Sequence, residues 1–302
     1  MTKQSPAAHV VNDPLRPLIE RAVSEHIGRP WQVHDSRDMA EFASHPSAIL
    51  SGGGLAVFAK FSAAEDALEQ FTSEVSGLRL LSERAGILTP APIGIVPAPG
   101  GCILILEAVL AVERGSRQWR EIGQALARIH RVKGGHCGLD AHGFFGPLRQ
   151  DNTPERDWPT FYAEHRLRPG LRLAVDSGHL PATAARLVEK LISRLPELCG
   201  PERTPSLLHG DAQQNNFIST EQGAAAIDPA VYYGNPELDL AMVDYFEPVP
   251  NDVLDGYRDE LPVDPGFPER CDLWRVWGYL GCVAVEGGVY VDKLMEAVRK
   301  YV

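Results

Sequence analysis

The sequence has no long apolar run, few cysteines and little positive charge, and each of these absences excludes a class of protein. Its longest apolar stretch, residues 103–112, contains Glu107 and is far shorter than the ~20 residues of a membrane-spanning helix. The 5 cysteines include no C-x-x-C pair, which indicates reduced thiols in a cytoplasmic protein. At a net charge of −11, the chain lacks the clustered Lys and Arg that nucleic-acid binding requires. We therefore expect no membrane span and no nucleic-acid partner.

Length and composition are those of an ordinary globular protein. With 302 residues, of which 44% are hydrophobic and 23% charged, the chain can form a sizeable core and two structural units. Residues 1–13 lack the apolar core of a signal peptide, which favours a cytoplasmic location.

The first third of the chain mixes strand and helix patterns. Residues 48–50 and 55–60 are apolar and flank a glycine-rich turn, which predicts a β-hairpin. A helix is expected next, with Ser62 and Glu65 as its capping box and Gly86 as its C-terminal cap. The apolar residues at helical spacing in this segment are Leu68, Phe71, Val75 and Leu78. A Pro-rich segment, residues 89–99, then leads to an apolar strand at residues 102–106.

Later in the chain the apolar spacing becomes helical. We expect helices at residues 119–129, 161–173 and 182–195, and again from residue 269 onward. A turn-rich stretch, residues 206–227, lies between the third and the last of these. Strands early and helices late predict an α+β fold of two lobes. We expect a small mixed lobe with an antiparallel sheet at residues 1–107, and a larger, mainly helical lobe at residues 108–302.

One short segment of the second lobe has the spacing of a phosphoryl-transfer site. His209, Gly210 and Asp211 are followed by Asn216 and later by Asp228, as in the catalytic loop of protein kinases. In that chemistry one carboxylate orients the acceptor hydroxyl as catalytic base, while Asn and Asp oxygens hold Mg2+ for ATP. The pattern predicts Asp211 as the base and Asn216 and Asp228 as metal ligands.

Local structure supports this grouping. Residues 217–218 and 224–227, joined by a turn at Gly223, are expected to form a hairpin that brings Asn216 and Asp228 together. Taken singly, each of these polar residues is also an ordinary turn or cap residue. Only their joint spacing indicates a kinase.

Gly210 separates two kinds of kinase. Phosphorylation-regulated protein kinases carry an arginine at this position, which pairs with an activation-loop phosphate. A glycine cannot form that pair, so the sequence favours a kinase of small molecules.

The first lobe supplies candidates for ATP binding. Lys60 ends an apolar strand, and Glu74 lies on the apolar stripe of the following helix, where an unpaired carboxylate is costly. A strand lysine paired with a helix glutamate positions ATP phosphates in kinases. The backbone of Glu107, Ala108 and Val109, directly after a strand, is expected to contact the adenine. No G-x-G-x-x-G motif is present, so a phosphate-covering segment is placed by position alone at residues 44–47.

At these residues the sequence resembles the fructosamine kinase family, relatives of the aminoglycoside phosphotransferases and choline kinases. The similarity extends over most of the chain from about residue 48. The segments that carry it are Lys60 with Glu74, residues 157–162, 165–167, 209–216, 227–234 and 237–241, and Gly266, Phe267 and Arg270. The resemblance implies transfer of the ATP γ-phosphate to a sugar hydroxyl of a ketosamine, either a fructosamine or a ribulosamine.

The catalytic loop departs from the usual family pattern at three positions. Ala212 and Gln213 replace a Leu-Trp pair, and Asn215 replaces a glycine. Gln213 therefore becomes a candidate substrate residue, because an amide in place of an aromatic ring exchanges stacking for hydrogen bonding. An aminoglycoside or amino-alcohol acceptor remains the alternative. A non-catalytic nucleotide-binding protein on the same fold is the alternative of another class.

Two other residues have open roles. Asp239 near the start of a helix is either a partner of the helix dipole or a support of the catalytic loop. Trp158 is either part of the core or one wall of the acceptor site. We expect a monomer or weak homodimer that acts on a small amine-bearing sugar or a glycated amine.

Overall fold

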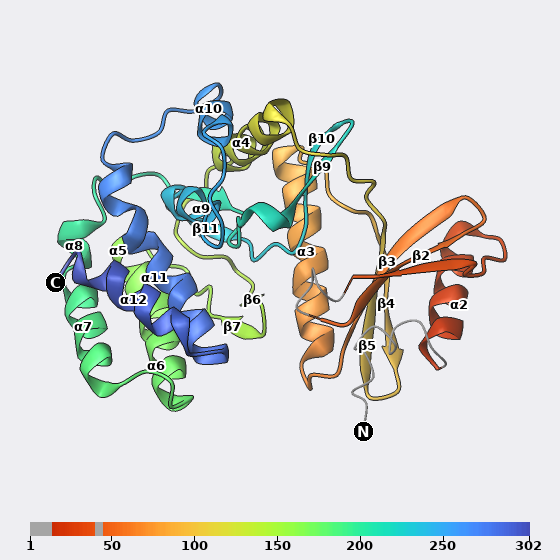
Figure 1. Ribbon diagram of the computed structural model, residues 1–302, viewed down its shortest axis with the longest axis horizontal. Helices are drawn as coiled ribbons and strands as arrows, with labels where there is room; N and C mark the ends of the chain where they lie inside the picture. The colour runs from red at the N-terminus through yellow and green to blue at the C-terminus, as the bar shows by residue number, and fades with distance from the viewer. Residues whose placement is uncertain (1–13, 40–44) are drawn as a thin grey trace. The chain divides into compact units, whose positions relative to one another are not determined.

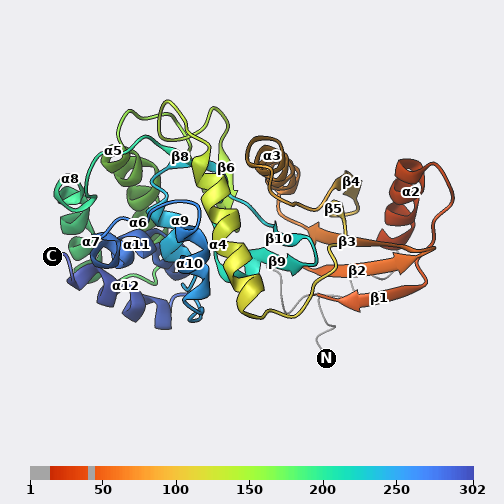
Figure 2. The same ribbon diagram turned by 90° about the horizontal axis from the view of Figure 1, so that it is seen from above.

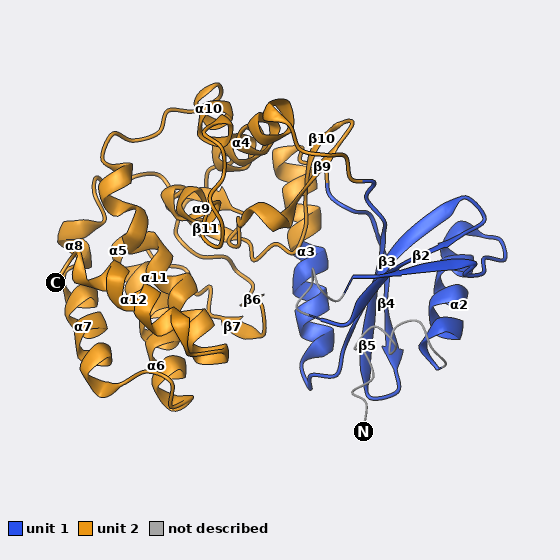
Figure 3. Cartoon of the chain, in the orientation of Figure 1, with its two compact units in different colours: residues 1–76, 89–110 blue, residues 77–88, 111–302 orange. Residues whose placement is uncertain are grey.

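The computed structural model describes residues 14–39 and 45–302, and the chain divides into two compact units (Figures 1 and 3). Unit 1 comprises residues 1–76 and 89–110, and unit 2 comprises residues 77–88 and 111–302. The sequence predicts one boundary, after residue 107. In the structure the last boundary falls after residue 110, and residues 77–88 also belong to unit 2. An assignment of ATP binding to one lobe and catalysis to the other stays a prediction.

Unit 1 is built on a five-stranded antiparallel sheet in the order β1-β2-β3-β5-β4. Its strands are β1 (Asp35–Asp38), β2 (Ser47–Gly52), β3 (Leu55–Ser62), β4 (Pro92–Ala98) and β5 (Gly101–Glu107). Helix α2 (Leu15–Ile27) lies on one face of this sheet (Figure 2). Its buried side chains, Leu15, Ile19 and Val23, pack with inward-facing strand residues such as Leu50 and Ile105. Buried and partly exposed positions alternate along much of β2 and β3, as the period of two along a strand requires when one face is covered.

The expected hairpin is confirmed as β2 and β3. The strands pair from Gly52 and Leu55 outward, and the turn between them is formed by Gly53 and Gly54. Both glycines have positive φ, at 55° and 82°, a region that side chains with a Cβ rarely enter.

Helix α3 (Ala67–Ala85) begins later than expected. The predicted capping box is wrong, because Ser62 is still part of β3, paired with Cys102 of β5, and its hydroxyl accepts a hydrogen bond from the backbone N–H of Ala64. Leu68 is 55% exposed, whereas Phe71 and Leu78 are buried. The expected C-terminal cap is present, since Gly86 has a φ of 64° and its N–H bonds the carbonyl of Ser82.

The Pro-rich segment after this helix contains strand β4, which the sequence pattern did not predict. Pro92 and Pro97 lie on this strand, which is the edge of the sheet and pairs only with β5 among the described strands. An edge strand tolerates proline because the N–H groups on its outer side have no neighbouring strand to bond, so the missing N–H of proline costs no hydrogen bond.

Unit 2 is mainly helical, with three two-stranded sheets. Its helices are α4 (Ser116–Arg131), α5 (Trp158–Tyr162), the π-helical turn η1 (Ala163–Leu167), α6 (Arg168–Asp176), α7 (Ala182–Ser193), α8 (Leu195–Leu198), the 3-10 turn η2 (Gln214–Asn216), α9 (Glu237–Met242), α10 (Asp252–Arg258), α11 (Phe267–Val285) and α12 (Val289–Arg299). Its strands are β6 (Gly143–Phe145), β7 (Leu148–Gln150), β8 (Ser206–Leu208), β9 (Phe217–Thr220), β10 (Gly223–Ala226) and β11 (Tyr232–Gly234).

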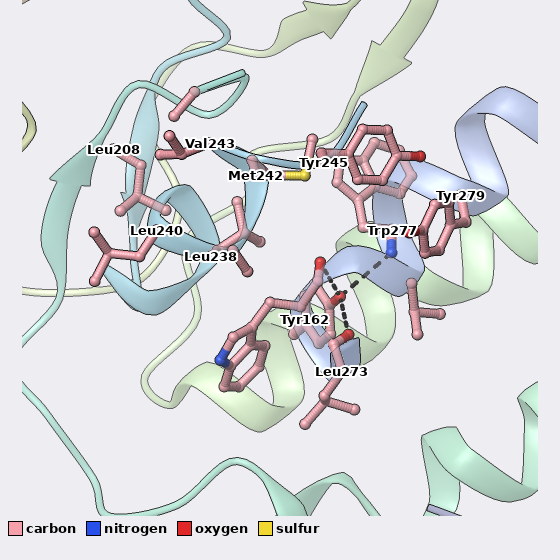
Figure 4. Packing of buried hydrophobic residues seen from close by; sticks show 14 of the residues in the cluster. Tyr162, Leu208, Leu238, Leu240, Met242, Val243, Tyr245, Leu273, Trp277 and Tyr279 are labelled. Carbon is pink, nitrogen blue, oxygen red and sulfur yellow. Dashed lines mark hydrogen bonds between the residues drawn. The ribbon is translucent and has the colours of Figure 1, made fainter. Parts of the chain in front are cut away.

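An aromatic core holds the helices of unit 2 together. The buried Tyr162 hydroxyl donates to the carbonyl oxygens of Leu273 and Trp274 and lies near the N–H of Trp277 (Figure 4). Trp158 stacks on Tyr162 with ring centroids 5.3 Å apart. Buried tyrosines find polar partners because an unsatisfied hydroxyl is costly, so this contact ties α5 to α11 in a defined register.

No helix among the described residues is long and apolar enough to cross a membrane.

Candidate active site

The candidate catalytic loop leaves strand β8 through a glycine that no other residue can replace without a shift of the backbone. Gly210 has a φ of 82°, and a Cβ added there would lie 2.0 Å from the carbonyl oxygen of Ala230. The Ala230 N–H in turn donates to the carbonyl of His209. The close approach of these two segments therefore requires glycine at this position.

Asp239 of α9 holds the backbone of this loop from behind. One of its carboxylate oxygens accepts from the N–H of His209 at 2.6 Å, and the other accepts from the N–H of Gly210 at 3.0 Å. His130 donates its Nε2–H to the same carboxylate at 3.1 Å, and the side chain of Asp239 is fully buried. Of the two roles left open by the sequence, the geometry favours the support of the catalytic loop.

His209 is a neutral structural residue in this geometry. Its Nε2–H donates to the carbonyl of Ile227 at 3.1 Å, and its Nδ1 accepts from the N–H of Asp211 at 3.3 Å. Burial lowers the pKa of His209, which favours the uncharged ring. The imidazole thus links the loop to the chain segment that leads to Asp228.

The side chain of Asp211 lies in a crowded polar site. Desolvation by the surrounding protein raises the pKa of Asp211 to about 7, and the negative charges of Asp228 and Asp239 act in the same direction. Hydrogen bonds from Asn216 and Gln213 oppose this rise. A carboxylate with a pKa near neutrality is suited to accept a proton at physiological pH.

Asn216 and Asp228 lie at the open end of the β9–β10 hairpin, as the sequence pattern predicts. Strand pairing continues past β10, because the N–H of Ile227 donates to the carbonyl of Asn216 at 2.9 Å. The turn differs slightly from the prediction, because Gly223 is the first residue of β10 and does not lie at the centre of the turn. The hairpin therefore brings two residues 12 positions apart in sequence next to each other.

The orientation of the Asn216 amide matters for metal binding. Its Nδ2 donates to the carbonyl oxygen of Asp211 at 2.8 Å and to the Asp211 carboxylate at 2.9 Å. The amide oxygen then faces away from Asp211, which leaves it as an acceptor. Asp228 adopts a φ of 49°, an uncommon value for a residue with a side chain and one that is enriched at functional sites.

These oxygen groups fit a divalent cation of the magnesium type. Mg2+ prefers carboxylate and amide oxygens and usually completes its shell with water and substrate phosphates. Within residues 14–39 and 45–302, no group of three or more His, Cys, Asp or Glu side chains is placed to hold a metal ion by itself. Asn216 and Asp228 therefore suit a metal that arrives with phosphates.

In unit 1 the expected ion pair is present. Lys60 of β3 and Glu74 of α3 lie with Nζ and Oε2 2.6 Å apart, and their side chains are only 6% and 12% exposed. The Lys60 ammonium also lies 5.8 Å from the ring centre of Phe71. The pair explains how a carboxylate is tolerated on the buried stripe of this helix.

Glu107 ends β5, Ala108 and Val109 follow it, and two of the N–H groups of these residues donate to neighbouring backbone carbonyls. The N–H of Glu107 donates to Ala91, and that of Ala108 donates to Ala56. The expectation that the backbone N–H and C=O groups of these residues contact the adenine stays a prediction. The two bonds leave the N–H of Val109 and the carbonyl groups as candidates for that contact. The expected phosphate-covering segment begins at Ser44, outside the described residues, whereas Pro46 and Ser47 already bond to sheet residues.

The departures in the loop differ in their surroundings. Ala212 is fully buried, so its small side chain belongs to the core. Gln213 is half-buried and hydrogen-bonded to Asp211.

Trp158, which lies outside this loop, is 8% exposed and stacked in the aromatic core. This position supports a role in the core over a role as a wall of the acceptor site.

The sequence pattern missed how α9 is held in place. Glu237, the first residue of α9, accepts from Nε and Nη2 of Arg270 at 2.8 and 2.6 Å and from the indole N–H of Trp274 at 2.9 Å. This buried clamp joins α9, which carries Asp239, to α11. Helix-start acidity was the only sequence signal for Glu237, and it did not point to a partner 33 residues away.

The chain is similar to known kinases in sequence and in structure. The family described as fructosamine kinase matches residues 15–302. A protein from Synechocystis sp., provisionally named a ketoamine kinase, is 29% identical over 287 residues, which is 93% of this chain and 95% of the relative. The crystal structure of a protein from Thermobifida fusca, provisionally named a fructosamine-3-kinase, matches with a TM-score of 0.82 at 30% identity, over 94% of this chain and 98% of that one.

A more distant structure shares the fold. It is an aminoglycoside phosphotransferase in a ternary complex with AMP-PNP and hygromycin B, with a TM-score of 0.62 at 14% identity over 93% of this chain and 98% of that one.

Fold and comparisons together define an α+β kinase-like phosphotransferase with an alcohol group as acceptor. Within that class, the chain belongs to the fructosamine kinase family.

Proposed function

We propose that this protein transfers the γ-phosphate of ATP to a sugar hydroxyl of a ketosamine, with Asp211 as the catalytic base. The observation that carries the proposal is the hydrogen bond from the Asn216 amide to Asp211, which joins the proposed base to a proposed metal ligand in one short loop. Asp211 takes the proton of the acceptor hydroxyl as its oxygen forms a bond to the γ-phosphorus. The bond between the γ-phosphorus and the bridging oxygen breaks, and ADP leaves.

In this proposal Asn216 and Asp228 hold Mg2+. Both offer oxygen atoms at the end of the β9–β10 hairpin, and the amide orientation of Asn216 reserves its oxygen for a cation. When bound, the ion supplies charge neutralisation for the phosphates. The chain's own contribution is to keep the two ligands at a fixed spacing.

Lys60 is the proposed partner of the ATP phosphates, and Glu74 orients it. The 2.6 Å ion pair limits the rotamers of a flexible side chain. For the adenine, the carbonyl of Glu107 and the N–H of Val109 are the proposed contacts. A cytoplasmic site of action agrees with the ATP requirement and with five free cysteines in the structure.

In this proposal the acceptor binds beside Asp211, next to Gln213 and near the segment that contacts Gln214. Gln214 donates its backbone N–H to Val243 and its side-chain amide to the carbonyl of Glu247, which fixes residues 243–247 against the catalytic loop. Phe246 in this segment is 41% exposed. With Gln213, these groups offer hydrogen bonding and one apolar surface for a sugar with an amine substituent.

The decisive experiment measures ATP consumption against matched panels of ribulosamines, fructosamines, aminoglycosides and amino alcohols. We expect turnover of ketosamines, and we expect Asp211→Asn to lower kcat by roughly 10²–10⁴-fold with nucleotide binding retained. Undiminished turnover in this variant would contradict the role of Asp211. Consumption with aminoglycosides or amino alcohols alone would reject the ketosamine.

The panel also tests the alternative of another class. ATP binding with no phosphate consumption on any acceptor would indicate a non-catalytic nucleotide-binding protein. If ketosamines are substrates, Gln213→Trp should change the preference among them, because it restores an aromatic ring beside the base. Asp211→Asn in the same background should remain inactive.

A further inference from the structure

Arg114 is a partly buried arginine in the short segment between residue 110 and helix α4, and it faces the catalytic turn. Its Nη2 donates to the carbonyl oxygen of Gln214 at 3.0 Å and also to the carbonyl oxygen of Phe217. These two carbonyls bracket η2, the turn that contains Asn216. A single guanidinium nitrogen therefore ties together both ends of the turn.

Two further contacts fix the arginine itself. The guanidinium carbon lies 4.8 Å from the ring centre of Trp119, in the first turn of α4. Two residues earlier, the N–H of Val112 donates to the carbonyl of Ser219 in β9 at 2.8 Å. The segment that carries Arg114 is thus bonded along the same hairpin that presents Asn216 and Asp228.

Partial burial of the Arg114 guanidinium costs free energy, which the contacts of the charged group must offset. Desolvation lowers the pKa of Arg114, yet a guanidinium stays protonated at any physiological pH. Its hydrogen bonds go to two backbone carbonyls, and its guanidinium lies against an aromatic ring. A partly buried charge that bonds neutral groups is well suited to orient them, because charge-assisted hydrogen bonds are strong and directional.

The Gln214 carbonyl shows what the arginine adds. This oxygen already accepts the N–H of Phe217, which closes the 3-10 turn. The 3-10 geometry is less stable than an α-helical turn and is used in short pieces. The second donor from Arg114 stiffens a turn whose own hydrogen bonds are weak.

We propose that Arg114 is a positioning residue for the metal-binding turn. By clamping the carbonyls of Gln214 and Phe217, it holds the Asn216 amide at the distance from Asp211 that both metal binding and base function need. This inference rests on the proposed function, since it deepens the account of the same site.

The test compares Arg114→Ala and Arg114→Lys with Arg117→Ala as the matched control. Arg117 lies nearby on α4, its side chain is 69% exposed, and it forms an ion pair with Glu121 on the same helix. We expect Arg114→Ala to raise the Mg2+ concentration for half-maximal turnover by about 10–100-fold, the usual effect of removing a group that orients a metal ligand. Arg114→Lys should recover part of the loss, because lysine supplies a donor without the planar fork. Arg117→Ala should match the wild type.

A second measurement does not depend on turnover. Backbone hydrogen exchange of residues 213–219 should be faster in Arg114→Ala than in the wild type, with exchange in β2 and β3 unchanged. Calorimetric titration with AMP-PNP should show a smaller gain in affinity on adding Mg2+. Equal exchange and equal Mg2+ dependence in all variants would overturn the proposal.

The outcomes separate this inference from the proposed function. If the wild type phosphorylates no acceptor, the exchange and titration data still decide the role of Arg114. If Arg114→Ala does not fold, as judged by its thermal transition, the same measurements on Arg114→Lys decide. A lysine variant that folds and equals the wild type in exchange and Mg2+ dependence would also reject the role.

Discussion

In unit 1 a lysine and a carboxylate neutralise each other at 2.6 Å, whereas in unit 2 burial, together with the charges of Asp228 and Asp239, raises the pKa of a third carboxyl, Asp211. The first arrangement is stable by itself. The second stores repulsion between like charges, which is relieved by protonation or by a cation. Under the proposed function, the first arrangement is a preformed contact for phosphates, and the second is a centre for a metal and a proton.

The two arrangements also differ in how they are built. The Lys60–Glu74 pair joins one strand and one helix close in sequence, so a local pattern reveals it. The unit 2 centre is held by the backbone bonds to Asp239 and the clamp at Glu237, which join segments about 30 residues apart. Long-range contacts of this kind leave little trace in a local pattern.

The largest expected effect comes from removing the carboxylate that is proposed as a metal ligand in unit 2. Asp228→Ala should lower turnover by more than about 100-fold and weaken binding of Mg·AMP-PNP, because it deletes a ligand and not merely a group that orients one. Binding of metal-free AMP-PNP serves as the control and should change little. Full activity at ordinary Mg2+ would show that the metal does not depend on this carboxylate.

Removing the support of the catalytic loop should affect both stability and rate. Asp239→Ala leaves the N–H groups of His209 and Gly210 and the ring N–H of His130 without their carboxylate. Each buried donor left unsatisfied costs about 1–3 kcal/mol, so we expect a loss of several kcal/mol in the free energy of unfolding. Denaturant unfolding measures it, and a change under about 1 kcal/mol would mean that water replaces the carboxylate.

The ion pair of unit 1 allows a test that separates stability from function. Glu74→Gln alone should destabilise the protein by about 3 kcal/mol, since it removes the charge partner of a nearly buried lysine. The double change Lys60→Met with Glu74→Leu should restore stability, because well-packed apolar residues often replace a buried pair without loss. Nucleotide affinity should nevertheless fall about tenfold or more, as titration would show. Unchanged affinity in the stable double variant would make the pair purely structural.

The raised pKa of Asp211 has consequences for activity and stability. Turnover needs the ionised form, so it should fall by about tenfold per pH unit on the acidic side of this pKa. That limb should begin below about 7, because bound Mg2+ offsets the negative charges that help to raise the pKa in the metal-free protein. The stability of the fold changes with pH in the opposite direction to turnover. A folded-state pKa above the ordinary value of 3.8 makes ionisation of Asp211 costlier in the folded protein than in the unfolded chain. Stability from the protonated form is present below pH 3.8 and is lost as pH rises towards about 7.

Asp211→Asn should remove this loss. In metal-free protein, the stability of the variant relative to the wild type should increase between pH 4 and pH 7, as measured by denaturant unfolding. A constant difference across this range would show that Asp211 keeps an ordinary pKa.

The smallest expected effect concerns the exposed carboxylate of unit 1. Glu107→Gln should change ATP affinity by less than about twofold, because the proposed adenine contacts come from the backbone and the side chain is exposed. Isothermal titration with ATP measures it. A large loss would mean that the carboxylate itself binds the ribose or an acceptor amine.

By itself, the sequence determined the elements whose side chains repeat with a regular period, together with the residues whose spacing is dictated by phosphoryl transfer. It located the β2–β3 hairpin, the end of α3 at Gly86, the β9–β10 hairpin and the Lys60–Glu74 pair, because each depends on contacts within a few tens of residues. It failed at Ser62, where strand pairing with Cys102 outweighed a local capping signal, and at β4, where an edge position accommodates proline.

Only the tertiary structure decided what Asp239, Glu237 and Arg114 do. Each is an ordinary polar residue in its own segment, and its hydrogen-bond partners lie 29 to 109 residues away. The bonds exist because packed helices bring the end of one segment to the backbone of another, where a buried polar group must be satisfied. No periodicity of the chain encodes that meeting, since it depends on how the whole core of unit 2 packs.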